Sequence, residues 1–200
     1  MDDTAIEDAI EAYISSYPSS SSDPSEYELE LERLANADSW SFYNVLLDRA
    51  HLHIAHTSPE QDRLVGLIVW LESHAIGGAQ RVDGMSGAQS FGIAVRELWN
   101  GTLEDNTVEQ WTALNALVAR LVQAGITGFE PYGIWAMRDA LEDDTTEDTP
   151  GLVPAAAVWF LYAGERIYAL SKEEGREWTR ATRGGTARWK DGSWGYSVGR

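Results

Sequence analysis

An arginine lies within an apolar helical pattern at residues 133–142, GIWAMRDALE. At 100° per residue, Arg138 falls between Leu141 and Trp135, so we expect its guanidinium to point into the fold. A guanidinium is permanently charged and carries a planar fork of donors, which suits it to bind carboxylates and oxyanions. Arg138 is therefore the first candidate for chemistry.

Two interpretations of Arg138 remain open. In the structural one, an acid satisfies the charge and ties two helices together; the candidate acids are Asp139, Glu165 and Asp62. An unpaired buried charge costs several kcal/mol, which favours such a partner. In the functional one, Arg138 is the fixed cation of a pocket and binds a carboxylate, enolate or carbonyl oxygen, while His53 or Asp139 transfers a proton.

The densest group of titratable side chains contains His51, His53 and His56, preceded by Asp48. Helical spacing places His51 about 160° from His53, so three imidazoles cannot converge from one regular helix. The chain also lacks a His-Glu-x-x-His pattern and has no cysteine. We predict no metal site, and expect histidines at the surface or at a helix end, with an acid/base histidine as the alternative.

Aromatic residues could supply an apolar pocket, since the chain has nine tryptophans and eight tyrosines. Most of these rings are expected in the core, but large rigid rings also leave interstices that suit an apolar or polyketide-like ligand. Asn115 falls on an apolar helical stripe and must be hydrogen-bonded if it is buried. The candidate substrate-binding residues are Trp70, Trp111, Trp135, Trp159 and Tyr162.

Composition and absent motifs exclude several classes of function. The net charge of −17 opposes binding to nucleic acid and to anionic membranes. The glycine-rich stretch at 77–87 lacks the spacing of a nucleotide loop, and no Gly-x-Ser-x-Gly elbow occurs, so we expect no cofactor. The N-terminus is acidic rather than basic and the longest apolar run, 152–163, is short. These features predict a cytoplasmic protein; a homodimer is one open option.

Hydrophobic periodicity predicts an all-α fold, a single domain over residues 1–200 with about eight to nine helices, in a bundle or in paired layers. Residues 17–25 are predicted to form a Ser/Pro linker, 77–92 a glycine-rich crossing, and 183–200 an irregular tail. The expected helices cover about 6–17, 26–34, 39–56, 59–71, 91–99, 107–123, 131–141, 154 to beyond 163, and 171–182.

Charge is divided between the two ends of the chain. Residues 1–48 contain 12 acids and one base, whereas residues 166–200 contain eight bases and four acids. We expect the basic end to lie over the acidic helices; a tail that recruits an acidic partner is the alternative.

The second half of the chain contains the segment GIWAMRDALE, the acidic loop after it, the helix start at 153–156, the WFLYAG segment at 159–164 and Tyr168. Through these features it resembles the fungal domain-of-unknown-function 3632 family. The similarity is strongest over 111–168. It implies a helical domain and a place near secondary-metabolite genes, and it carries over no catalytic residue.

Two functions follow from these residues. The first is a small-molecule-binding protein with an aromatic pocket, such as a cofactor-independent cyclase or isomerase of fungal secondary metabolism. The second is a non-catalytic acidic helical module that binds a protein partner. A closed cavity reached by Arg138 or a histidine would favour the first, and a packed interior with an open groove the second.

Overall fold

The fold is all-α, as predicted, with eight helices in the part of the chain that the computed structural model describes. This part consists of residues 3–16, 26–75, 87–100, 106–142, 149–172, 181–182, 185–190 and 193–198. None of these helices combines the length and the hydropathy that crossing a membrane requires. The predicted Ser/Pro linker, the acidic loop and most of the glycine-rich crossing lie outside the described residues.

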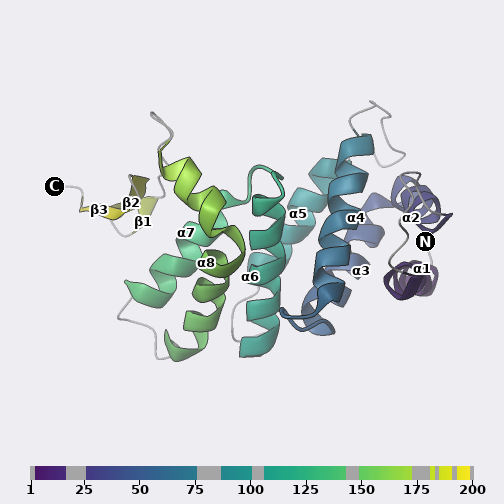
Figure 1. Cartoon of the computed structure of the whole chain (residues 1–200), viewed down its shortest axis with the longest axis horizontal. Coiled ribbons are helices and arrows are strands. Elements are labelled where there is room, and N and C mark those ends of the chain that lie inside the picture. The colour runs from purple at the N-terminus through teal and green to yellow at the C-terminus, as the bar shows by residue number, and fades with distance from the viewer. Residues whose placement is uncertain are drawn as a thin grey trace. The chain divides into compact units, whose positions relative to one another are not determined.

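By the contacts within it, the chain divides into two compact units, Met1–Ala113 and Leu114–Arg200. The first unit contains α1 (Asp3–Ser16), α2 (Glu26–Ala37), α3 (Ser39–Leu52), α4 (Pro59–Ala75), α5 (Gly87–Asn100) and the start of α6 (Val108–Gln123). The second contains the rest of α6, then α7 (Glu130–Leu141), α8 (Thr149–Ser171) and three strands (Figure 1).

In the first unit, α3 is the central helix and packs against α1, α2 and α5. Its side chains Phe42, Tyr43 and Leu46 are fully buried, because apolar residues recur on it at helical spacing. Asp38 caps the helix: its carboxylate accepts a hydrogen bond from the Ser41 backbone N–H at 3.1 Å. This backbone hydrogen bond lowers the pKa of Asp38 below its ordinary value.

α6 ends at Gln123, where the sequence predicted the end of the 107–123 helix, and a glycine follows it. Gly125 adopts φ = 94°, its N–H donates to the Val122 carbonyl, and the Ile126 N–H donates to the Leu121 carbonyl. This pair of bonds satisfies the last carbonyls of the helix, and the left-handed φ favours glycine.

In the second unit, α7 and α8 pack against each other. Gly133 of α7 permits the close approach, because a Cβ at this position would lie 2.6 Å from Cε3 of Trp159 on α8. α8 begins at Thr149 rather than near Pro154 as predicted, so Pro154 lies inside the helix. Thr149-Pro150 is a typical helix start, since proline is tolerated in the first turn.

Three short strands lie in the C-terminal part of the chain. Strands β1 (Ala181–Thr182), β2 (Gly185–Lys190) and β3 (Ser193–Val198) form an antiparallel sheet in the order β1-β2-β3. At one end of the β2–β3 ladder, Lys190 pairs with Ser193. The helix predicted at 171–182 is therefore wrong in its last two residues, and its residues 173–180 lie outside the described part.

Candidate functional site

Arg138 is paired with its neighbour on α7. Its Nε donates to Oδ1 of Asp139 at 2.7 Å, and its Nη2 contacts the same oxygen. The Arg138 side chain is 17% exposed and that of Asp139 38% exposed. Asp139, one of the three candidate acids, thus binds the guanidinium, while Glu165 is exposed on α8. Because Asp139 lies on the same helix as Arg138, this pair does not tie two helices together.

Trp159 forms the centre of the second unit's core. Its ring is fully buried, and its Nε1–H donates to Oδ1 of Asn115 on α6 at 2.8 Å. Asn115 is also fully buried, so the expectation of a buried amide satisfied by protein is confirmed. Because Gly133 lies against the same ring, Trp159 joins α6, α7 and α8.

The other four predicted substrate-binding rings belong to separate contacts. Trp70 and Trp111 lie in the first unit, and Trp135 and Tyr162 in the second. The structure does not bring the five rings together within either unit. Among their contacts are those of Trp70 with His74, Trp111 with Trp99, Trp135 with Tyr132, and Tyr162 with the Arg120 guanidinium, which lies 3.4 Å from the ring centroid.

The three clustered histidines have different environments. His51 is buried and its Nδ1 lies 2.9 Å from the Leu47 carbonyl oxygen, one turn earlier on α3. His53 is exposed at the C-cap of α3, and His56 is half-buried beyond it. No group of three or more His, Asp or Glu residues with metal-binding geometry occurs in the described part of the chain.

A groove between α1 and α3 is the candidate site, and one of the predicted catalytic residues, His53, lines it. The groove has a volume of about 510 Å³. Both helices belong to the first unit and pack against each other. The lining residues are Asp3, Glu7, Asp8 and Glu11 of α1, Val45, Asp48 and Arg49 of α3, and His53 after it.

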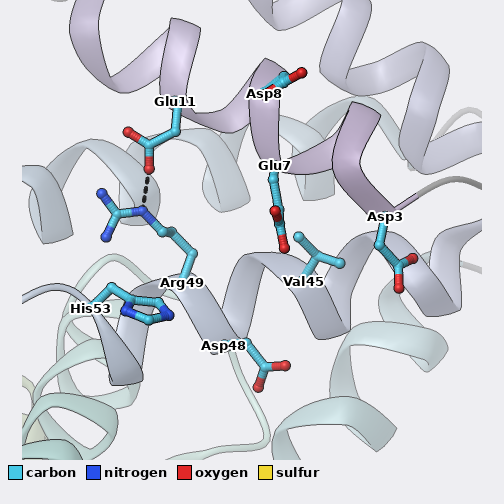
Figure 2. A pocket seen from close by; sticks show the side chains of 8 residues that line it. All are labelled: Asp3, Glu7, Asp8, Glu11, Val45, Asp48, Arg49 and His53. Carbon is cyan, nitrogen blue, oxygen red and sulfur yellow. Dashed lines mark hydrogen bonds and ion pairs between the residues drawn. The ribbon is translucent and has the colours of Figure 1, made fainter.

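The acids lie in this groove because of their spacing. Asp3, Glu7 and Glu11 are four residues apart on α1 and so follow one helical face. Arg49 is one turn after Val45 on α3 and forms an ion pair with Glu11. Figure 2 shows Glu7 and Glu11 pointing from α1 toward α3, with Arg49 and His53 at the Glu11 end.

Negative charge dominates the groove. Its lining contains five carboxylates and one guanidinium, and that guanidinium pairs with Glu11. The other four carboxylates form no hydrogen bond or ion pair with any side chain or backbone group among the described residues: Asp3, Glu7, Asp8 and Asp48. Carboxylates without partners on an open surface attract cations, and the groove thus has the chemistry of a binding site for amines or guanidinium groups.

The sequence contains a signal for this groove beyond the total acid excess of residues 1–48. The i, i+4, i+8 spacing of Asp3, Glu7 and Glu11 assigns three of those acids to one face of one helix. What the sequence could not give is the pairing of that face with α3.

Residues 43–200 match the family model described as a protein of unknown function (DUF3632). The match covers more than half of the chain, from within α3 to β3, and begins after α1 and α2. No curated protein and no solved structure matches the chain.

Proposed function

The chain belongs to the DUF3632 family, and we propose that this member is a non-catalytic interaction module that binds a positively charged protein segment in the groove between α1 and α3. The observation that carries the proposal is the groove itself, about 510 Å³ in volume and lined by five carboxylates. Lysine and arginine side chains are long enough to reach such acids while the peptide backbone stays at the rim.

The form of the groove supports a peptide rather than a small apolar ligand. Pockets for drug-sized ligands are mostly apolar with few polar groups. Here Val45 is the single apolar residue of the lining, and acids stand on both helices. A segment with several basic residues can neutralise acids along the length of α1, whereas a single small cation neutralises one or two.

The charge of the whole chain supports the same partner. A net charge of −17 accelerates the approach of basic segments and repels acidic ones. Because exposed charge pairs each contribute little, several must act together to give useful affinity. The four groove carboxylates that have no partner among the described residues supply such a set.

The aromatic pocket for a small apolar molecule, with Arg138, Asp139 and His53 as catalytic residues, stays a prediction. Arg138 and Asp139 lie on α7 in the second unit and His53 follows α3 in the first. Of the three predicted catalytic residues, only His53 lines the groove. The proposal of a binding groove therefore rests on the charge and shape of its lining.

The test is binding of a fluorescein-labelled peptide of alternating lysine and serine, followed by fluorescence anisotropy at about 0.15 M salt. The triple variant Asp3→Asn, Glu7→Gln, Asp48→Asn removes three groove charges. At roughly 0.5 kcal/mol for each exposed pair, it should weaken binding about tenfold.

The matched control removes the same number of charges from exposed acids outside the groove, through Glu109→Gln, Glu142→Gln and Glu165→Gln. The control should weaken binding less than about threefold, since distant exposed charges are screened at this salt concentration. Equal weakening by the two triple variants would mean that the peptide follows the total charge and that the groove is not its site.

A further inference from the structure

α8 carries an apolar stripe on its exposed face. Val153 is 45% exposed, Phe160 51%, Leu161 67% and Tyr168 56%. These positions follow one another at intervals of seven, one and seven residues, so they share one face of the helix. Soluble proteins seldom expose four large apolar side chains on one helical face. Where they do, the surface normally marks an interaction site.

The stripe contains no acidic side chain. From Thr149 to Gly164, α8 contains no Asp, Glu, Lys or Arg, in a chain where 47 of the 200 residues are charged. The charged residues of α8 are Glu165 and Arg166, which cancel each other, and the ammonium of Lys172, just after the helix, lies 5.0 Å from the centre of the Tyr168 ring. The excess of acids found elsewhere on the chain, which would repel a second copy, is thus absent from this helix.

The order of residues along the stripe is symmetric about the peptide bond between Phe160 and Leu161. Two α8 helices that cross antiparallel at this point would place Val153 opposite the partner's Tyr168, and Phe160 opposite the partner's Leu161. Each contact would occur twice, as a two-fold interface requires. The paired positions extend over 16 residues, from Val153 to Tyr168, or about 22 Å of helix.

Two small residues complete the symmetry. Ala157 is exposed, and in the antiparallel crossing it lies opposite the partner's Gly164. A Cβ at Gly164 would meet nothing within 4 Å, so packing inside the chain does not explain why glycine, which costs about 1 kcal/mol in a helix, stands there. Small residues at the crossing of two helices let their backbones approach closely.

We propose that this stripe is a homodimer interface, in which α8 packs antiparallel against α8 of a second copy of the chain. Taking about 200 Å² for a fully exposed large side chain, the four side chains offer roughly 400 Å² per copy and 800 Å² per dimer. Stable interfaces bury about 1,600 Å² in total, so the dimer is weak, with a dissociation constant on the order of 100 µM. The interface is separate from the α1/α3 groove.

Sedimentation equilibrium over a concentration series tests the dimer. Wild type should pass from monomer to dimer as its concentration rises through about 100 µM. Leu161→Glu should raise the dissociation constant more than tenfold, because it buries a carboxylate beside an apolar partner. The matched control Leu141→Glu alters an equally exposed leucine, 62% against 67%, on α7 and should leave association unchanged. Monomeric wild type at 1 mM, or equal effects of the two substitutions, overturns the proposal.

Cysteine cross-linking tests the register and does not depend on how Leu161→Glu folds. The chain has no cysteine, so the double variant Ala157→Cys, Gly164→Cys introduces the only thiols. Within one α8 these positions are seven residues, or about 10 Å, apart, beyond disulfide reach, whereas the proposed crossing brings each next to its counterpart in the partner. Oxidation of the double variant should give a covalent dimer on a non-reducing gel. Each single-cysteine variant should give far less covalent dimer. No covalent dimer, or as much from a single variant, contradicts the antiparallel register.

Discussion

Gly133→Ala is the substitution that probes the packing of α7 on α8 most sharply. An alanine at an ordinary helical position is more stable than glycine by about 1 kcal/mol. At position 133, however, the added Cβ would lie 2.6, 2.9 and 3.0 Å from three ring carbons of Trp159. Carbon atoms pack best at about 3.5–4.0 Å, so the ring or the helix must move by about 1 Å.

The neighbours of Trp159 limit that movement. The ring is fully buried, and its Nε1–H is held by a 2.8 Å hydrogen bond to Asn115. Overpacking of a filled core costs about 1–3 kcal/mol, and a disturbed buried hydrogen bond about 1 kcal/mol more. After the gain in helix propensity, Gly133→Ala should lower the free energy of unfolding by about 1–3 kcal/mol.

Urea denaturation followed by far-ultraviolet circular dichroism measures this change, at a concentration well below that of the proposed dimer. Gly164→Ala is the matched control on the same unit, because a Cβ there meets nothing within 4 Å. The control should raise the free energy of unfolding by about 0.5–1 kcal/mol. If Gly133→Ala stabilised the protein as much as the control does, the close packing of α7 against Trp159 would be refuted.

Three further substitutions have expected outcomes. Asn115→Ala leaves the buried Trp159 N–H without its acceptor and should cost about 2 kcal/mol in urea denaturation. The pKa of Asp38 is lowered in the folded chain, so its stabilisation is present above about pH 4 and is lost as pH falls through the lowered value. Asp38→Ala should therefore cost about 1 kcal/mol at pH 7 and show a smaller loss of stability on acidification than wild type does; parallel pH curves would contradict the cap. Asp139→Asn weakens the half-exposed pair with Arg138 and should cost at most about 1 kcal/mol, with a smaller cost in 1 M salt; a salt-independent cost would contradict the ion pair.

Most of the helices could be predicted because local chemistry determines them. The apolar stripe at 107–123 and the glycine after it predicted α6 almost to the residue. The helix predicted from residue 59 likewise begins there, as α4 does at Pro59. The predicted start near Pro154 is wrong for α8, because both Pro154 and Pro150 fit the first turn of a helix and the helix begins at the earlier one, with Thr149-Pro150.

The candidate site could not be predicted to the same degree, because it depends on which helix faces which. The sequence identifies Arg138 as a charge on an apolar helical face. It offers three acids as partners, and spacing alone does not show that Asp139 binds the guanidinium. The groove needs α1 and α3 side by side, a contact between residues about 40 positions apart in the chain, and no periodicity encodes such a pairing.

Nuclear magnetic resonance titration of the isotope-labelled chain with the lysine/serine peptide tests the central proposal most directly. If the α1/α3 groove is the binding site, chemical-shift changes should concentrate on the backbone amides of its lining, such as Glu7, Glu11, Val45 and Asp48, and should saturate. Shifts spread evenly over exposed acids such as Glu109 and Glu165, or concentrated on another surface, would contradict the proposal.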